Sequence, residues 1–381
     1  MRILLIANTL PPHDLSGVGE QVIQLAAGLR QRGHEVEVLG RGGEGASGPK
    51  ILFPLAIVRP ALRKIAAFRP DVVQLHESDG GLLAARLATV SGRPLVVALL
   101  QVSYLEERRA VRPLRFAGET LGEPGRVERR FRRFKAPLQI ALGRRTIRSA
   151  DLVLAPSAVT AQELARDYGA GSPLVLPNAS GSQAEDRTPV GGIDAAERAL
   201  LFVGRLRIRK GVEVLLKALA LLRARGERPR LRIVGAGEHR EALEKAVLKF
   251  GVSEQVDFLG RRSPAEIRWL LDRSAALVVP SIYEGMPLVV LEAMRSATPV
   301  VASRVSGIPE VVSDPDTGWL VPPEDPPALA AALSQVLEMP DEARRRGVQG
   351  AQRLEERYLP ERVAAIWESL ITRALAERRA R

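Results

Sequence analysis

The stretch ALLFVGRLRIRKGVEVLLKALALLRARG, residues 199–226, decides the fold class. Its first apolar run, residues 199–206, is typical of a buried strand, and the apolar periodicity after Gly211 predicts a helix. A strand that leads through a loop into a helix is the repeating unit of a parallel sheet with helices on both faces. We therefore expect an α/β, doubly wound fold around this stretch.

The same alternation runs through the rest of the chain. Short apolar runs interleave with amphipathic stretches from ILLIAN (3–8) to the Ser- and Gly-rich residues 179–192, and the rhythm restarts after them. We therefore predict two Rossmann-like domains that face each other across a cleft, residues 1–178 and residues 193–355. A last amphipathic helix within residues 356–381 is expected to pack back on the N-terminal domain.

Composition excludes several classes of protein. The 381 residues are 46% hydrophobic, but no apolar stretch reaches the roughly 18 residues of a membrane span. The opening MRILLIANTL resembles a buried strand rather than a signal peptide, so we expect a cytoplasmic protein. The chain has no cysteine and only four histidines. Neither a metal site nor a cofactor is expected.

The positive charge of the chain is concentrated in residues 105–148. The formal net charge is +12, and this stretch holds thirteen Arg and Lys against five Asp and Glu. Phe131 and Phe134 interleave with the cations, a pattern that fits an anionic lipid or a membrane surface and predicts peripheral attachment to the inner membrane face. A solvated Arg-rich face is the alternative. Nucleic-acid binding is not expected, because no recognition motif accompanies the charge.

The loop of the opening stretch contains residues suited to a phosphate ligand. Gly204 allows a ligand to approach the backbone, and the cations Arg205 and Lys210 in a strand-to-helix loop suit a diphosphate. A solvated basic loop is the alternative.

A second candidate lies in PSIYEGMPLVVLEAM, residues 280–294. A proline suits the first position of a helix, which places Glu292 on the second turn and Glu284 in the preceding turn. A carboxylate accepts two hydrogen bonds and matches a vicinal diol such as a ribose. The alternative is a glutamate on the helix surface together with a glutamate that caps the helix. We expect backbone groups of the turn to face the same ligand, and the residues concerned are Gly285, Met286, Pro287 and Leu288.

A third candidate is PPHDLSGVGEQV, residues 11–22, in which Gly17 precedes a helix. It departs from the dinucleotide fingerprint, because Val22 stands where a third glycine is needed. We therefore exclude a nicotinamide dehydrogenase. A loop that offers amides to a phosphate and a plain connector both remain open.

Together, these motifs resemble those of the family 4 retaining glycosyltransferases of GT-B fold, the glycosyl transferase group 1. The resemblance covers nearly the whole chain and is strongest from 199 to 325, through FVGRLRIRKG, VGAGE, VDFLGR, PSIYEGMPLVVLEAM and PVVASRVSGIPEVVSDPDTGWLVPPED in this order. It implies transfer of a sugar from a UDP-, GDP-, ADP- or dTDP-linked donor, with retention of configuration and without metal. Residues 1–178 would then be the acceptor-side domain and residues 193–355 the donor-binding domain.

The resemblance also implies roles for single residues. Arg205 and Lys210 would bind the donor diphosphate, and Glu292 the ribose. Glu284 would hold the donor sugar together with the 285–288 backbone, and Gly17 would lie against the β-phosphate or the sugar. Three further glycines would line the donor site, namely Gly204, Gly235 and Gly237. Arg205, Lys210 and Glu284 are the catalytic candidates.

One departure from the family concerns the strand PLVVALLQ. The family strand usually ends in Thr-x-His, and its histidine contacts the donor, whereas Leu100 stands at that position here. Either Gln101 or His76 substitutes in contacting the substrates, or the donor sugar differs, or activity is weakened or lost. We therefore expect a glycosyltransferase acting on a glycolipid, a polysaccharide or a small molecule. The alternative is a catalytically silent nucleotide-sugar-binding protein, and a sugar-nucleotide epimerase is disfavoured by the order of the motifs.

Overall fold

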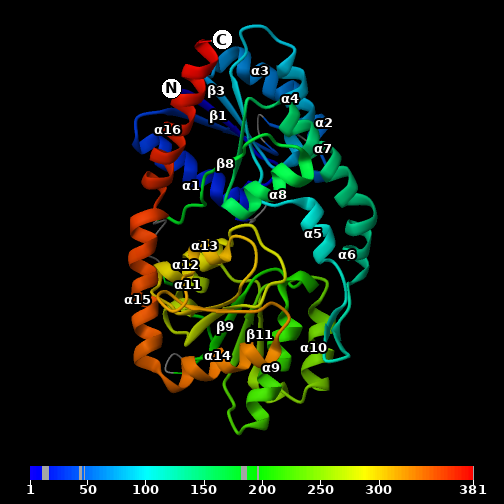
Figure 1. Ribbon diagram of the computed structural model, residues 1–381, viewed down its shortest axis with the longest axis vertical. Coiled ribbons are helices and arrows are strands. Elements are labelled where there is room, and N and C mark those ends of the chain that lie inside the picture. The colour runs from blue at the N-terminus through cyan, green and yellow to red at the C-terminus, as the bar shows by residue number, and fades with distance from the viewer. Residues whose placement is uncertain (11–16, 43–44, 47, 182–186, 195–196, 381) are drawn as a thin grey trace. The chain divides into compact units, whose positions relative to one another are not determined.

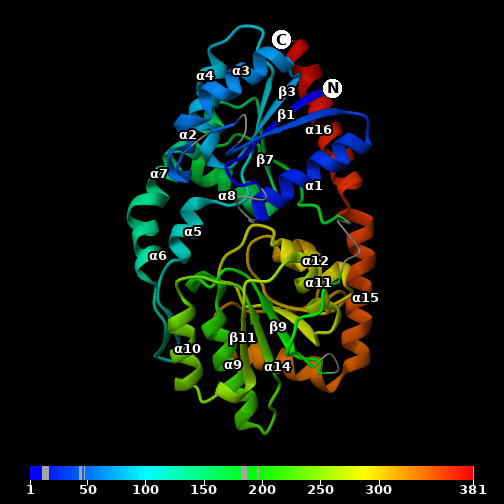
Figure 2. The ribbon, with the colours of Figure 1, turned by 180° about the vertical axis from the view of Figure 1, so that it is seen from behind.

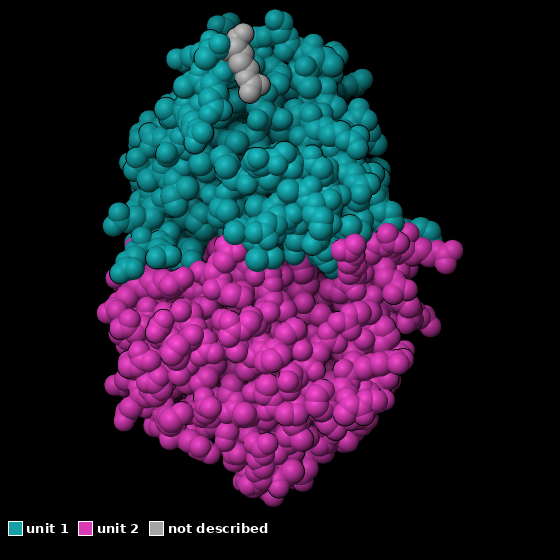
Figure 3. All heavy atoms as spheres, viewed as in Figure 1, with its two compact units in different colours: residues 1–106, 134–181, 356–381 teal, residues 107–133, 182–355 magenta. Residues whose placement is uncertain are grey.

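The chain forms two compact units of strands and helices, drawn as a ribbon in Figure 1 and coloured by unit in Figure 3. Unit 1 comprises residues 1–106, 134–181 and 356–381, and unit 2 comprises residues 107–133 and 182–355. The computed structural model describes residues 1–10, 17–42, 45–46, 48–181, 187–194 and 197–380. The domain limits drawn from the sequence stay a prediction.

The described part of unit 1 contains a six-stranded parallel sheet in the order β2-β1-β3-β4-β7-β8. The strands are β1 (Arg2–Ile6), β2 (Glu35–Leu39), β3 (Val72–His76), β4 (Leu95–Leu99), β7 (Leu152–Ala155) and β8 (Leu174–Val175). Every residue of β3 and β4 is buried, as expected for a parallel sheet covered on both faces. The strand order reverses between β1 and β3, and such reversals are where open α/β sheets bind ligands.

In unit 1, helices α1 (Gly17–Gln31) and α16 (Pro360–Arg379) lie side by side (Figures 1 and 2). Trp367 of α16 is fully buried, and its Nε1 donates to Gln74 Oε1 of β3 at 2.6 Å. A Cβ at Gly28 of α1 would lie 2.3 Å from the Pro360 carbonyl oxygen, so the two helices approach each other through a glycine. The other helices whose residues all belong to this unit are α2 (Phe53–Ala56), α3 (Val58–Phe68), α4 (Gly81–Ala88), α7 (Ala136–Ser149) and α8 (Ala158–Tyr168).

Unit 2 contains the second parallel sheet, whose six described strands follow the order β11-β10-β9-β12-β13-β14. The strands are β9 (Leu200–Val203), β10 (Leu231–Val234), β11 (Val256–Gly260), β12 (Ala276–Val279), β13 (Val300–Ser303) and β14 (Trp319–Val321). The stretch 199–226 forms central strand β9 and helix α9 (Val212–Ala224). Both sheets are parallel and doubly wound, so the predicted fold class is confirmed.

Residues 107–133 also belong to unit 2. They contain the antiparallel hairpin β5 (Leu114–Phe116) and β6 (Glu119–Gly122), which packs on α9 and α10 (Arg240–Lys249), and the short helix α6 (Arg126–Arg130). The other helices whose residues all belong to this unit are α11 (Pro264–Asp272), α12 (Leu288–Arg295), α13 (Ile308–Val311) and α14 (Pro326–Glu338). Helices α5 (Tyr104–Ala110) and α15 (Pro340–Arg357) complete the described set.

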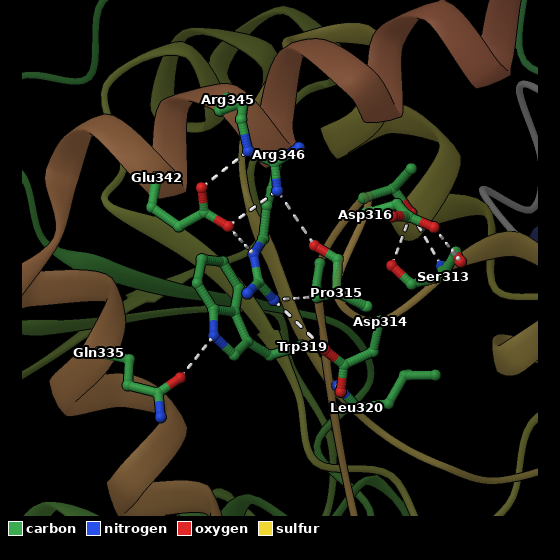
Figure 4. A network of polar contacts seen from close by, with 12 residues as sticks. Ser313, Asp314, Pro315, Asp316, Trp319, Leu320, Gln335, Glu342, Arg345 and Arg346 are labelled. Carbon is green, nitrogen blue, oxygen red and sulfur yellow. Dashed lines mark hydrogen bonds and ion pairs between the residues drawn. The ribbon is translucent and has the colours of Figure 1, made fainter.

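Arg346 ties α15 to β14 within unit 2, as Figure 4 shows. Its guanidinium carbon lies 3.9 Å from the centroid of the Trp319 ring. Its Nη1 donates to the Gly318 carbonyl oxygen at 2.8 Å, and its Nε donates to Glu342 Oε1 at 2.8 Å. One side chain therefore supplies both a stacking contact and hydrogen bonds between a helix and the edge of the sheet.

Across the described residues, no helix has the length and apolar composition needed to cross a bilayer.

Candidate functional site

The loops that follow β9 and β12 lie against each other where the strand order of unit 2 reverses. The Ile282 N–H donates to the Arg209 carbonyl oxygen at 2.8 Å. Gly211 has φ of 65°, and a Cβ there would lie 2.0 Å from the Pro280 carbonyl oxygen. Only glycine fits this left-handed, crowded position. The predicted cations and the predicted glutamate are therefore held at one edge of one sheet.

Glu284 and Lys210, both predicted as site residues, form a buried ion pair. The Lys210 ammonium donates to Glu284 Oε1, which also accepts from the Ser281 hydroxyl at 2.7 Å. Burial favours a raised pKa for Glu284, but Lys210 and Arg209 outweigh it and hold the pKa below its usual value. Burial lowers the pKa of Lys210, and Glu284 opposes that shift. The carboxylate thus fixes the ammonium in place.

Arg209 is a residue of this cluster that the sequence analysis did not select. Its side chain is only 17% exposed, its Nε lies 3.1 Å from Glu107 Oε1, and its Nη1 lies 3.7 Å from Glu284 Oε2. Nη1 also donates to the Tyr283 carbonyl oxygen at 3.1 Å. The motif shows four cations in one loop, but it does not show which of them points inward to carboxylates.

Two of the predicted glycines have a packing role that the structure makes visible. A Cβ at Gly235 would lie 1.8 Å from the Gly204 carbonyl oxygen, and a Cβ at Gly237 would lie 2.1 Å from the Leu206 carbonyl oxygen. The loop after β10 therefore packs directly on the loop after β9. At Gly204 the nearest atom to an added Cβ is 3.3 Å away, on Phe202. Ligand approach at these glycines stays a prediction.

The turn before α12 contains Gly285, Met286 and Pro287 of the predicted donor-site residues. Gly285 and Met286 are buried, and the Gly285 carbonyl oxygen accepts from the Gly307 N–H at 3.0 Å. Pro287 is the N-cap residue rather than the first helical residue, because α12 begins at Leu288. Glu292 lies on the second turn of α12 and is half-buried. The peptide groups at the start of α12 give that end a positive partial charge, which suits an anionic ligand.

In unit 1, Gly17 is the first residue of α1, and residues 11–16 of the same motif lie outside the described residues. The neighbouring Gly19 is required by packing, since a Cβ there would lie 2.4 Å from the Thr9 carbonyl oxygen. Any phosphate contact at Gly17 stays a prediction.

His76 ends β3 and is buried, with an Nε2 that lies 3.0 Å from Gln74 Nε2. Gln74 Oε1 already accepts from Trp367, so Gln74 Nε2 must be the donor and His76 Nε2 the acceptor. Burial lowers the pKa of His76 to about 3, which leaves a neutral ring with its proton on Nδ1. Among the described residues, this Nδ1 has no hydrogen-bond partner.

Gln101 follows β4, the strand next to β3, and it is also buried. Its backbone N–H donates to Glu77 Oε1 at 3.2 Å, whereas its side-chain Nε2 finds no hydrogen-bond partner within the described chain. Leu100 is fully buried in an apolar cluster with Ala98 and Ile140. The two polar candidates therefore lie on adjacent strands at the carboxyl edge of the unit 1 sheet, and Leu100 faces the core.

Exposure varies along residues 105–148, the basic stretch of the chain, more than its sequence indicates. The cations at positions 129, 130, 132, 133 and 135 are exposed, and Phe134 is 65% exposed. Phe131, however, is buried, so only one of the two predicted aromatic contacts with a membrane is at the surface. Phe131 and its neighbours form a short π-helical segment ahead of α7, which begins with Pro137 in its first turn.

The described residues contain no cluster of three or more His, Asp or Glu side chains arranged to hold a metal ion.

Comparison with known proteins extends over both halves of the chain. Residues 184–353 match the family described as Glycosyl transferases group 1, and residues 15–179 match Glycosyltransferase Family 4. A glycogen synthase of Mycobacterium tuberculosis (strain CDC 1551 / Oshkosh) is 30% identical over 383 residues, which cover 93% of this chain and 90% of that protein.

Solved structures share the fold. Sucrose-phosphate synthase from Thermosynechococcus elongatus superposes with a TM-score of 0.80 at 22% identity, covering 99% of this chain and all of that one. Anabaena HepE, solved in complex with UDP and glucose, gives a TM-score of 0.69 at 19% identity and covers 98% of this chain and 100% of that one.

Proposed function

Because this chain belongs to glycosyltransferase family 4, the glycosyl transferases group 1 of GT-B fold, we propose that it moves a sugar from a nucleotide-diphosphate donor to an acceptor with retention of configuration. It is a glycosyltransferase, as the order of its motifs predicts. The donor site, the donor and the acceptor are the parts that we propose. HepE was solved with UDP and glucose, which supports a nucleotide sugar as the donor.

The Lys210–Glu284 pair carries the proposal for the donor site. An ammonium has three N–H donors, and Glu284 takes one of them, so two can point at phosphate oxygens. Departure of a nucleoside diphosphate develops negative charge on an oxygen, and a cation fixed in advance stabilises that charge without reorganising and without a metal ion. Arg205, in the same loop, supplies the second cation, and Glu292 on α12 binds the ribose.

Nucleotide binding tests this assignment. We expect Lys210→Ala and Glu292→Ala each to weaken binding of the preferred nucleoside diphosphate by about 1 to 3 kcal/mol, the usual loss of a charged hydrogen bond. The measurement is calorimetric titration with UDP, GDP, ADP and dTDP in EDTA. Lys245→Ala is the matched control, since Lys245 is an exposed lysine of α10 paired with Glu241. Unchanged affinity in both site variants would remove the assignment.

Within the described chain, His76 Nδ1 and Gln101 Nε2 have no hydrogen-bond partner, which supports a role for both in contacting the sugar or the acceptor. A buried N–H without a partner is costly, and a hydroxyl oxygen of a substrate would satisfy it. We propose a glycolipid, a polysaccharide or a small glycoside as the acceptor. Known proteins that match this chain are named for products as different as glycogen and sucrose phosphate, so their names do not select among these acceptors.

A catalytically silent nucleotide-sugar-binding protein is the second candidate, and the burial of Leu100 in an apolar cluster favours it. A leucine in the core cannot replace the histidine of the family. Slow hydrolysis of the donor separates the two candidates, because a transferase releases free sugar in the absence of acceptor and a silent protein only binds. Release of free sugar by wild type, together with no release by Lys210→Ala, would support the transferase.

We further propose that the exposed face of α7 and of the π-helical segment ahead of it rests on an anionic membrane in the cytoplasm, where a lipid-linked acceptor would be found. Phe134 and Leu138 are 65% and 47% exposed, and Arg145 follows Leu138 by seven residues, which places it on the same helix face. Sedimentation with phosphatidylglycerol vesicles should fall for Phe134→Ser. Leu248→Ser, at an exposed leucine of α10, should not change it. Equal sedimentation of all three proteins would contradict the proposal.

A further inference from the structure

Residues 107–133, here called the strap, form an integral part of unit 2. Leu114 and Leu121 of the hairpin are buried in the same core cluster as Leu215 of α9. Glu119 pairs with Lys217 at 2.8 Å and with Lys249 at 2.7 Å. The strap is thus fixed by apolar burial and by charge to the two helices beside the loop after β9.

Glu128 of the strap reaches the loop that contains Arg205 and Lys210. Its side chain is 1% exposed, and its Oε1 accepts from the Ile208 N–H at 2.9 Å. Ile208 begins the short 3₁₀ helix that ends at Lys210, and N–H groups at the start of a helix lack partners within it. Glu128 therefore supplies the acceptor for a backbone donor two residues from the predicted phosphate-binding lysine.

The other oxygen of Glu128 is held in turn. Oε2 accepts from the Gly125 N–H at 3.1 Å and lies 2.7 Å from His239 Nε2. His239 Nδ1 lies 3.3 Å from Glu213 Oε1, and both side chains are buried. Burial lowers the pKa of His239 and raises that of Glu213 to about 8. A neutral His239 that donates to Glu128 and faces a protonated Glu213 satisfies this arrangement.

Glu107 holds the next residue of the same loop. Its Oε1 lies 3.1 Å from Arg209 Nε, and Arg209 contacts Glu284 and the Tyr283 carbonyl oxygen on its other side. Through Arg209, Glu107 is connected to the carboxylate that fixes Lys210. The strap therefore holds residues 208 and 209 with two separate carboxylates, of which Glu128 accepts hydrogen bonds and Glu107 pairs with Arg209.

We propose that Glu107 and Glu128 are positioning residues, which shape the 205–211 loop so that its cations meet the donor diphosphate. This inference rests on the proposed function. Neither carboxylate touches the donor; Glu128 acts through the Ile208 N–H and Glu107 through Arg209. A strap in the N-terminal half of the sequence thereby determines how strongly unit 2 binds phosphate.

The affinity ratio between a nucleoside diphosphate and the corresponding monophosphate tests the proposal. In Glu128→Ala and Glu107→Ala we expect the ratio to fall about fivefold or more, since only contacts to the second phosphate are misplaced. Glu128→Gln keeps an acceptor for Ile208 and should restore most of the ratio. Glu119→Ala is the matched control, because it removes a carboxylate of the same strap that pairs only with Lys217 and Lys249 among its described ion pairs.

The outcomes separate this inference from the function on which it rests. An unchanged ratio in both alanine variants, with wild type binding and Lys210→Ala weakened, would overturn the positioning role and leave the donor site intact. A loss of stability with equal weakening of diphosphate and monophosphate would make Glu107 and Glu128 merely structural and overturn the inference. Absence of nucleotide binding by the folded wild type would overturn both.

Discussion

A carboxyl group that holds its proton near neutral pH lies in the first turn of α9. Glu213 is buried, and burial raises its pKa to about 8. Its neighbours are His239 at 3.3 Å and Glu128, while Glu238 and Arg207 act on His239 from outside the cluster. A charged Glu213 would face the Glu128 carboxylate in a poorly solvated place, so the neutral acid is the stable form.

Thermal stability should therefore depend on pH through Glu213. The pKa of about 8 in the folded state exceeds the ordinary glutamate value of 4.5, which applies to the unfolded chain. The folded state thus binds more protons between these values, and stability present below pH 4.5 is lost as pH rises through 8. We expect the melting temperature of wild type to fall from pH 6 to about 9 more steeply than that of Glu213→Gln. The corresponding difference in the free energy of unfolding is on the order of a few kcal/mol. Glu241→Gln, at an exposed position of α10, should keep the wild-type slope. Equal slopes for wild type and Glu213→Gln would contradict the protonated state.

Single residues were predictable from the sequence where a motif places chemistry at a strand end. Lys210 and Glu284 were selected in this way, and the structure joins them. Arg209 and Glu128 were not, because their importance depends on partners far away in the chain, such as the 80 positions between Glu128 and Ile208. Residue type is visible in a sequence, but the partner of a buried charge is not.

At the scale of elements, the junction between α15 and β14 depends on the shape of one cation. Arg346 stacks on Trp319 and bonds Glu342 through Nε (Figure 4). A separate nitrogen, Nη1, donates to the Gly318 carbonyl oxygen. Lysine retains the charge but lacks the planar fork. We expect Arg346→Lys to lower the free energy of unfolding by about 1 to 3 kcal/mol in urea denaturation.

Arg345 provides the matched control for this prediction. It also pairs with Glu342, but its side chain is 48% exposed and surface ion pairs contribute little. Arg345→Lys should change stability by less than about 0.5 kcal/mol. If the two substitutions cost the same, the stacked and buried geometry of Arg346 would not be the source of its contribution.

Elements with strong periodicity were predicted well, and the strap hairpin was missed. The helix expected after Gly211 is α9, and it starts at Val212. The hairpin β5–β6 was not predicted because its apolar side consists of few side chains. These lie within an arginine-rich segment, which resembles a solvated surface. Its turn at Ala117 and Gly118 has positive φ at both residues, a weak signal that Gly118 could have given.

At the scale of the whole molecule, two doubly wound sheets follow from the alternation of strands and helices. Strand order does not follow from it: the two units differ, with the reversal between β1 and β3 in one and between β9 and β12 in the other. The alternation also does not show that residues 107–133 join unit 2. Periodicity depends on neighbouring residues, whereas the burial of Leu114 against α9 joins residues far apart in the sequence.

The interleaving of the two units along the chain has a consequence for biosynthesis. The strap leaves the ribosome before β9 and α9 exist, so Leu114 and Leu121 have no core to enter at that time. Trp367, which fills unit 1 beneath α1, is made only after the whole of unit 2. Although domains commonly fold in turn from the N-terminus during synthesis, neither unit here can close before the other is nearly complete. The nascent chain therefore keeps apolar core residues of both units exposed until synthesis is nearly finished.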